Sequence, residues 1–345
     1  MAGTWTTQNK ILPGAYVNFL TNTALSITPG DRGTVVLLQE MTVGTAGDMY
    51  TITATDASKW PEGAASADKL LTAEALKGAK TVKVYNLGEE HTAEVITAAL
   101  AALKTVDFNV LCYPYDNAAN QAAITTWIKA MREDEGIKVQ AVLAEHTADS
   151  EAVINVMQGV KLSDGTILTA AQTTAWVAGI TAGANVNKSN TGQIYLGAVD
   201  VVPRMTKSEM EAAITAGKFV LKVDAAQNVS AVYDVNSLTT ETVDKGKIFK
   251  KNRVIRTLDS INNDIVEIFE SNYVGKVNNN ADGRSLLRAT LIEYFNELQR
   301  INAIQNFTAE DVTISAGNDS DAVVIDCHIQ PVDSIEKIYI TVNLA

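Results

Sequence analysis

Few residues in this chain could do covalent or metal chemistry, and they lie far apart. The 345-residue sequence has three histidines and two cysteines: His91, His146, His328, Cys112 and Cys327. A nucleophilic hydrolase needs a serine or cysteine beside a histidine base, and a structural zinc site needs His and Cys ligands at short intervals. Neither spacing occurs, so we expect no catalytic residue, no metal site and no cofactor.

The motifs of nucleotide-dependent enzymes and of serine hydrolases are missing as well. The sequence has no GxGxxG after an expected strand, no GxxxxGK[ST] and no GxSxG. His91 and His146 each follow a glutamate near the boundary of an expected element. We interpret both as solvent-facing side chains without a chemical role.

The charge balance argues against nucleic acid as a ligand. The net charge is −12, and the only dense basic run is 245–251, whereas phosphate binding needs a basic face. No stretch approaches the roughly 20 apolar residues of a membrane span, and the first residues lack the pattern of a signal peptide. Both cysteines lie in apolar runs, which predicts buried thiols and folding in the reducing cytoplasm.

The elements that would position these residues alternate between strand and helix over the first two hundred residues. Apolar strands are expected at 32–39, 81–87, 108–113 and 137–144, with helices between them at 66–77, 91–104 and 117–134. Such alternation predicts a parallel sheet built from βαβ units and covered by helices. We expect the same pattern to continue through 153–160, a helix at 170–183 and a closing segment at 194–202.

A part of mixed α+β character is expected after Pro203. Its predicted elements are a helix at 207–215, a hairpin over 219–235, a helix at 251–273, a second helix after the loop 275–283, a hairpin over 312–330 and a final strand at 337–344. The final strand alternates apolar and polar residues, which is typical of a strand with one buried face.

The helix expected at 251–273 carries the most informative pattern. Its apolar residues recur at spacings of four and three, at Val254, Leu258, Ile261, Ile265 and Ile268. This spacing places them on one stripe of the helix. The polar residues between them, including Arg253, Arg256 and Asp259, are interpreted as its outer surface.

The segment 245–265 resembles the C-terminal domain of contractile tail sheath proteins. Shorter resemblances follow in order along nearly the whole chain, at 13–14, 32–33, 74–79, 176–179, 182–183, 185–192 and the terminal strand. The chain resembles most the short sheaths of PBSX-like defective phages, their intact phage relatives and the R-type bacteriocins.

This resemblance implies a fold with two domains and two terminal arms. The first domain would be a three-layer α/β domain, similar to subtilisin-like proteases but without their catalytic triad. The second would be an α+β inner domain with exchangeable terminal strands. We divide the chain into an N-terminal exchange arm (1–20), an α/β sheath domain (21–200), an α+β C-terminal domain (201–333) and a C-terminal exchange strand (334–345).

The function implied by the resemblance is structural and mechanical. The subunit would polymerise as stacked six-membered rings around a tail tube and contract to drive the tube through a target cell envelope. Its partners would be copies of itself, the tail tube protein, the baseplate and the tail terminator, with no nucleic acid and no membrane insertion. It would belong to a virion tail sheath or a tailocin particle, assembled in the host bacterial cytoplasm.

Two groups of residues are candidates for contacts between subunits. Residues of the terminal strands would pair with neighbours by β-augmentation: Ala15, Tyr16, Val17, Asn18, Phe19, Ile338, Tyr339, Ile340, Thr341 and Val342. We expect these strands to swing out at the chain breakers 21–23 and 331–334. Four basic residues, Lys250, Lys251, Arg253 and Arg256, either form a solvated face or contact an acidic patch on the tube or a neighbour.

Two other classes of protein remain open from the sequence. A hydrolase or nucleotide-binding enzyme would gather polar residues at the carboxyl ends of the parallel strands. Those ends carry carboxylates, as at Glu89, Asp116 and Glu145, but no nucleophile paired with a base. The other class is a self-assembling tube or shell protein unrelated to tails.

Overall fold

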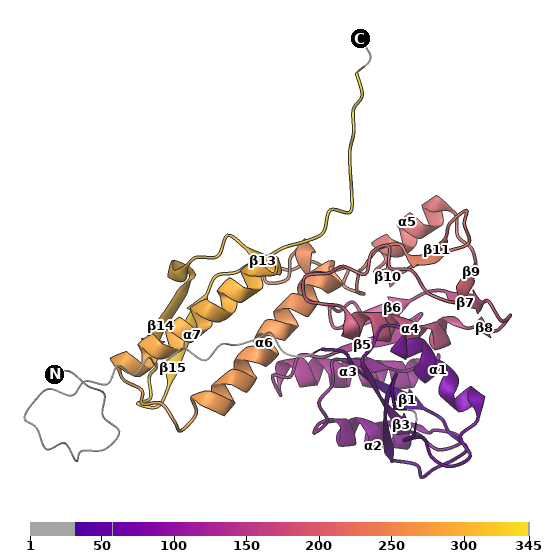
Figure 1. Cartoon of the computed structure of the whole chain (residues 1–345), viewed down its shortest axis with the longest axis horizontal. Helices are drawn as coiled ribbons and strands as arrows, with labels where there is room; N and C mark the ends of the chain where they lie inside the picture. The colour runs from indigo at the N-terminus through magenta and orange to yellow at the C-terminus, as the bar shows by residue number, and fades with distance from the viewer. Residues whose placement is uncertain (1–31, 57, 344–345) are drawn as a thin grey trace, which may run out of the picture.

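A long helix joins two lobes in the computed structural model, which describes residues 32–56 and 58–343 (Figure 1). The larger α/β lobe contains a seven-stranded sheet. Its strands in spatial order are β10 (Lys218–Phe219), β6 (Val153–Val156), β5 (Gln140–Ala144), β4 (Val110–Cys112), β1 (Thr34–Gln39), β3 (Thr81–Asn86) and β2 (Met49–Thr53). All neighbours are parallel except β2, which pairs antiparallel with β3 at one edge. The predicted parallel sheet is thus confirmed, while β2 lies just after a stretch that the sequence shows only as turn-rich.

Helices cover both faces of this sheet. The covering helices are α1 (Ser66–Leu76), α2 (Ala93–Leu103), α3 (Ala118–Glu133) and α4 (Ala170–Gly183). Alternate residues of β1 enter different cores: Val35 and Leu37 pack in the core that includes α4, whereas Val36 and Leu38 pack in the core that includes α2 and α3. The predicted three-layer α/β arrangement is confirmed.

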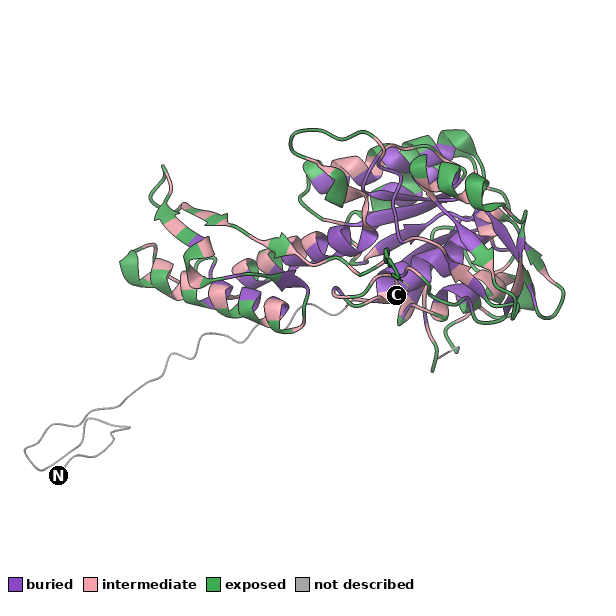
Figure 2. Ribbon diagram, turned by 90° about the horizontal axis from the view of Figure 1, so that it is seen from above, coloured by how far each residue is buried: buried purple, intermediate pink, exposed green. Residues whose placement is uncertain are grey.

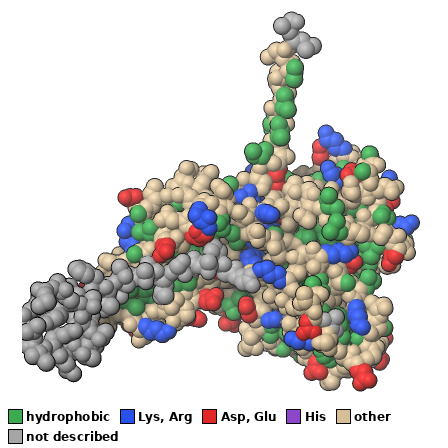
Figure 3. Space-filling view, in the orientation of Figure 1, with side chains coloured by type: hydrophobic (Ala, Val, Ile, Leu, Met, Phe, Trp, Pro, Cys, Tyr) green, Lys and Arg blue, Asp and Glu red, His purple; other side chains and the backbone are tan. Residues whose placement is uncertain are grey.

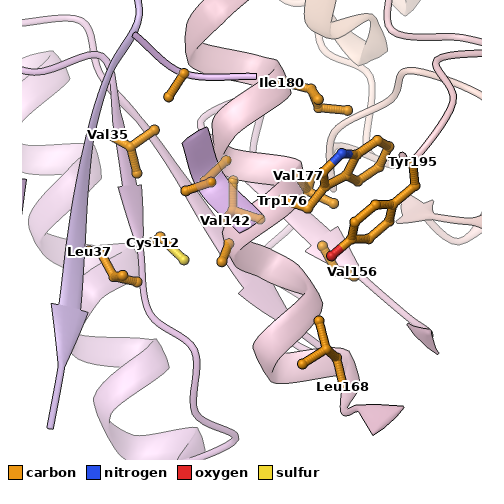
Figure 4. Close-up of a cluster of buried hydrophobic side chains, with 14 of the residues drawn as sticks. Val35, Leu37, Cys112, Val142, Val156, Leu168, Trp176, Val177, Ile180 and Tyr195 are labelled. Carbon is orange, nitrogen blue, oxygen red and sulfur yellow. The ribbon is translucent and has the colours of Figure 1, made fainter. Parts of the chain in front are cut away.

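Helix α4 is buried nearly all round because it lies between the sheet and α1. Trp176 of this helix stacks on Tyr195 at 4.2 Å between ring centroids, and both rings are 1% exposed (Figure 4). Helix α1 approaches so closely that a Cβ on Gly179 would lie 2.1 Å from the carbonyl oxygen of Ala75. Only glycine permits this contact between the two backbones.

The C-terminal boundary of the α/β lobe differs from the prediction. The segment 198–202 is β9, which joins β7 (Gly159–Leu162) and β8 (Ile167–Leu168) in a separate three-stranded sheet. The main sheet ends instead with β10, which follows α5 (Lys207–Thr215), and the hairpin of β11 (Leu221–Val223) and β12 (Val229–Ala231) packs on the same core. A boundary at 200/201 therefore cuts through one hydrophobic core.

The C-terminal lobe is smaller and more open. It comprises the 3-10 helices η1 (Lys247–Lys250) and η2 (Ala309–Asp311), the helices α6 (Asn252–Asn272) and α7 (Ala281–Arg300), and the strands β13 (Ile304–Gln305), β14 (Val312–Ala316), β15 (Val323–Cys327) and β16 (Gln330–Pro331). The strands pair only as β13–β16 and β14–β15 in the described chain. The predicted helix pair and C-terminal hairpin are confirmed.

The prediction that the polar residues of α6 form its outer surface is wrong for the first half of this helix. Arg253, Arg256 and Asp259 are 6%, 0% and 4% exposed, because this half of the helix packs against the α/β lobe. In Figure 2 the C-terminal lobe changes from purple near the α/β lobe to pink and green at its far end. The polar residues are therefore part of the buried contact between the lobes. Only the later residues of the apolar stripe, Ile261, Ile265 and Ile268, pack in one core with α7.

Candidate functional site

The most unusual surface of the molecule is the end of the described chain. Residues 337–343 leave the body as an extended segment in which every residue is exposed (Figures 1 and 3). The exposed fractions of four large apolar or aromatic residues are 73% for Ile338, 91% for Tyr339, 78% for Ile340 and 76% for Val342. We call residues 338–343 the C-terminal arm.

The sequence-predicted strand at 337–344 has no strand partner in the described part of this single chain. Ile338, Tyr339, Ile340, Thr341 and Val342 instead form the arm. Residue 344 and the other predicted strand, Ala15, Tyr16, Val17, Asn18 and Phe19, lie outside the described residues.

The residues just before the arm, 333–337, are held by the body, and we call them the arm root. Within it the Glu336 carboxylate has a side-chain exposure of 6% and forms an ion pair with Lys251. It also accepts hydrogen bonds from Ser189 Oγ (2.9 Å) and Thr191 Oγ1 (2.6 Å). One carboxylate thus joins the arm root both to the start of α6 and to the loop after α4.

Lys251 is the centre of the cationic side of this contact. Its Nζ lies 3.2 Å from Asp333 Oδ2 and 4.1 Å from the centroid of the Tyr233 ring. Burial disfavours the ammonium charge, but Glu336 and Asp333 outweigh it and raise the pKa of Lys251 above its ordinary value. Lys251 is therefore charged, and its charge is neutralised within the subunit.

The other predicted basic residues serve different contacts. Arg253 donates to Ser334 Oγ (2.7 Å) of the arm root and to the Asn302 carbonyl (3.2 Å). Lys250 remains partly exposed and pairs with Glu241 at 3.0 Å. The four residues therefore do not form one solvated face, and Arg253 and Arg256 are not available at the surface of this single chain.

Arg256 belongs to a buried network around Asp234. Its guanidinium donates to the Lys188 carbonyl (2.7 Å) and lies 3.4 Å from Asp234 Oδ2. Asp234, which is 1% exposed, also accepts from Asn190 N (2.9 Å) and from Asn252 Nδ2 (2.9 Å). Buried charges need such partners, so Asp234 fixes the start of α6 against the α/β lobe.

The arm root and the Asp234 network are connected. Asp234 N donates to Thr191 Oγ1 at 3.0 Å, and Thr191 Oγ1 donates to Glu336. Glu336, Asp234 and Thr191 were missed as site residues from the sequence. The only signal was the Asn- and Ser-rich segment 185–192, and nothing in the sequence indicates that Glu336 lies against it.

The histidines and Cys112 do not form a hydrolytic site. The expectation that His91 faces solvent is wrong: its side chain is 7% exposed, with Nδ1 2.7 Å from Glu40 Oε1 and Nε2 2.7 Å from Tyr113 Oη. These contacts occupy both ring nitrogens. His146 Nε2 lies 3.0 Å from Thr125 Oγ1, and His328 is exposed.

The two cysteines are free thiols. Burial raises the pKa of the Cys112 thiol to about 12, which disfavours a nucleophilic thiolate. Cys327 is only partly buried, contrary to the prediction that both are buried. In the described part of the chain, no cluster of His, Cys, Asp and Glu could hold a metal ion.

Three family models match successive parts of the chain. They are described as the tail sheath protein Gp18 domain III N-terminal region (residues 32–87), the phage tail sheath protein central domain (89–237) and the phage tail sheath C-terminal domain (244–345). Together they include the α/β lobe, α6, the C-terminal lobe and the arm.

Individual relatives agree with these matches. The chain is 38% identical to the uncharacterized protein YqbK and 37% identical to the phage-like element PBSX protein XkdK, both of Bacillus subtilis, over 257 residues. Each match covers 72% of this chain and 55% of the relative, so the chain spans about half the length of these two proteins. A tail sheath protein of Clostridium phage phiCD119 is 35% identical over 212 residues, covering 61% of this chain and 59% of that protein.

Solved structures extend the similarity to the whole fold. The sheath tail protein of Desulfitobacterium hafniense superposes with a TM-score of 0.85 at 37% identity, covering 95% of this chain and 99% of that one. The sheath tail protein of Listeria innocua gives 0.81 at 29% identity, covering 90% and 94%. The contracted helical sheath of the anti-feeding prophage shares the fold, with a TM-score of 0.76, 15% identity and coverage of 97% and 99%.

These similarities agree with the structural character of the site. Of the helices in residues 32–56 and 58–343, none has the length and apolar composition needed to span a bilayer. The candidate site is an arm with an anchored root, and the named relatives and solved structures include tail sheath proteins of phage and bacteria and a contracted helical sheath. The chain belongs to the contractile tail sheath protein family.

Proposed function

We propose that this sheath protein polymerises as stacked six-membered rings around a tail tube, joined by terminal strands donated to neighbouring copies. The observation that carries the proposal is the arm. Ile338, Ile340 and Val342 occupy alternate positions and are more than 70% exposed. A strand with this pattern is a liability in a lone subunit, and pairing with another chain would bury its apolar face.

The acceptor in the neighbouring copy would be the C-terminal hairpin. Strands β14 and β15 form a two-stranded sheet in the described chain, and Val324 of β15 is 55% exposed. An added strand from another copy would satisfy main-chain donors and acceptors along an open edge, which is β-augmentation. The residues 15–19 are a second candidate strand for the same exchange.

Contraction would move whole subunits while the exchanged strands keep them joined. The α/β lobe suits rigid-body movement because its sheet is packed on both faces. The extended state would be a kinetically trapped lattice that contracts to drive the tube through a target cell envelope. The remaining partners would be the tube protein, the baseplate and the tail terminator, in a particle assembled in the bacterial cytoplasm.

The tube contact that we propose uses the basic residues still at the surface. Lys247 is exposed and Lys250 is partly exposed beside Glu241. They are candidates for contact with an acidic patch on the tube or a neighbour, whereas Arg253 and Arg256 would act within the subunit. The double change Lys247→Glu and Lys250→Glu should impair assembly on the tube without unfolding the subunit; normal contractile tails from it would exclude this contact.

Deletion of residues 338–345 tests the exchange. The truncated chain should remain a folded monomer by circular dichroism and size-exclusion chromatography, but form no tubes in electron micrographs. Ile340→Pro should act similarly because it removes a ladder donor in mid-strand, and Asn343→Ala should assemble normally. If the truncated protein still forms contractile tubes, arm exchange is not what joins the subunits.

A further inference from the structure

The expected hinge of the arm is not free in this structure. The chain breaker 331–334 predicts a swing before residue 335, yet this stretch is attached to the body at successive positions. Val332 N donates to the Ala303 carbonyl at 3.0 Å, directly after the β13–β16 pair. Asp333 pairs with Lys251, and Ser334 accepts from Arg253.

Burial along the chain shows where the attachment ends. Residues 333–336 alternate between exposed and half-buried, with Ile335 87% exposed and the Glu336 side chain turned inward. From Lys337 onward the alternation stops and every described residue is exposed. The last buried side chain is therefore Glu336. Lys337 is exposed but keeps its Nζ 5.9 Å from the centroid of the Tyr233 ring, so the free arm begins at residue 338.

The contacts of Glu336 are strong enough to hold the arm root on the body of the subunit. A carboxylate that accepts from an ammonium and two hydroxyl groups makes charge-assisted hydrogen bonds, which are stronger than neutral ones. Removing the Glu336 carboxylate would leave the partly buried Lys251 with only the more exposed Asp333 as a charged partner. A buried charge that loses a partner is costly. The arm root would therefore stay attached when the arm beyond it moves.

We propose that Glu336 is a positioning residue which anchors the arm, and that the joint on which the arm turns lies at Lys337–Ile338. This inference rests on the proposed exchange of arms between subunits. During contraction each copy would keep its arm root on its own body, and only the segment beyond 337 would reorient. Tension on an arm would pass through Glu336 and Thr191 to the Asp234 network, and so to the start of α6.

The anchor can be tested in the full-length chain, isolated as monomer, without any assembly step. A Cys327→Ser background leaves one native thiol, Cys112, which is buried. One spin label is attached through Lys207→Cys on the exposed surface of α5. The second is attached through Ile335→Cys or through Val342→Cys. Pulsed electron paramagnetic resonance then gives the distribution of distances between the two labels.

The expected result is a narrow distribution from Lys207 to residue 335 and a broad one to residue 342. Glu336→Ala should widen the distribution to residue 335, and so should Lys251→Met, which keeps the apolar stem. Glu310→Ala, an exposed glutamate elsewhere in the lobe, should leave both distributions unchanged. A distribution at 335 that is already as broad as that at 342, or that Glu336→Ala does not widen, would overturn the anchor.

The two proposals fail in different ways. If deletion of 338–345 leaves assembly intact while the labels show a fixed 335 and a mobile 342, the arm exchange is wrong and the anchor stands. If the deletion abolishes assembly but residue 335 is already mobile, the exchange stands and the joint lies before Glu336.

Discussion

The two lobes differ in how fully their strands are paired and in how much of their apolar surface is buried. In the α/β lobe the central strands pair on both sides, and the inner residues of β1, Val35 to Leu38, are 0% exposed. In the C-terminal lobe the described strands pair only in twos, and an apolar arm extends into solvent. We infer that folding stability is concentrated in the first lobe and that the second keeps unsatisfied surface for other copies.

The junction between the lobes resembles the first lobe rather than the second. Arg132 of α3 donates to both carboxylate oxygens of Asp259 in α6 at 2.7 Å, and to the Val139 carbonyl at 3.0 Å. Both side chains are about nine-tenths buried. This buried ion pair fixes α6 against α3.

Breaking this ion pair should have the largest effect on stability. Asp259→Ala should lower the free energy of unfolding by about 3–5 kcal/mol, because it leaves a buried guanidinium unpaired. Urea denaturation followed by circular dichroism measures the change. The double variant Arg132→Met with Asp259→Leu is the control, since it removes both charges and should recover most of the loss. A double variant as unstable as the single one would show that volume or packing, rather than charge, governs this junction.

Adding a methyl group where α4 contacts α1 tests packing within the α/β lobe only. Gly179→Ala should lower the free energy of unfolding by about 1–3 kcal/mol, because the new Cβ has no room beside the Ala75 carbonyl and the helices must shift. Gly246→Ala is a matched control, because its Cβ would meet no atom within 4 Å. Equal midpoints of urea unfolding for the two variants would contradict the close approach.

Much of the fold could be predicted because its patterns are local. The apolar strands and helical periodicity of 81–144 predict the parallel sheet. The loop 317–320 between two strand-like runs predicts the hairpin β14–β15. Strand β10 could not be placed, because a two-residue strand carries no periodicity and its pairing with β6 depends on a long-range contact. The same limit applies to the boundary predicted at 200/201, because β10 joins the main sheet only through this long-range pairing.

The candidate site was only partly predictable for a similar reason. The alternation of 337–344 predicts a strand, and its pairing with another chain stays a prediction. In this single chain residues 337–343 are extended and exposed. The spacing of α6 separates apolar from polar residues, but it cannot tell whether polar residues face water or another part of the protein. The spacing therefore predicts a surface position for Arg256. In the structure Arg256 is buried beside Asp234, which lies 22 residues earlier in the chain.

Acid should lower the free energy of unfolding by a smaller amount than the two substitutions above, because it weakens the contact of Asp149 with the segment 239–240. Asp149 accepts hydrogen bonds from Thr239 N (2.6 Å), Thr239 Oγ1 (2.9 Å) and Thr240 N (2.9 Å). Hydrogen bonds from Thr240 and Thr239 hold the pKa of Asp149 well below its usual range. Because the pKa is lower in the folded state, this stabilisation is present above the unfolded pKa of about 3.9 and is lost as pH falls through the folded value.

Asp149→Asn tests that assignment. At pH 7 the variant should be less stable than the wild type by about 1 kcal/mol, because the site is partly exposed and solvent screens the charge. The difference should shrink as the pH is lowered from about 4, where the wild-type carboxylate begins to lose its stabilising ionisation. Urea midpoints measured between pH 2 and pH 7 check this, and a gap that stays constant with pH would assign the loss to geometry instead of charge.

Removing the arm should have the smallest effect on the stability of the monomer, and this result would sharpen the contrast between the lobes. Residues 338–343 are exposed along their whole length, so they bury little apolar surface from which stability could come. Deletion of 338–345 should change the free energy of unfolding by less than about 0.5 kcal/mol. Deletion of 333–345 also removes Glu336 and should cost about 1–3 kcal/mol, because Lys251 then loses its charged partners. Equal stabilities of the two truncated chains would contradict the anchor at Glu336, while a large loss on the shorter deletion would mean that the arm packs on its own subunit in solution.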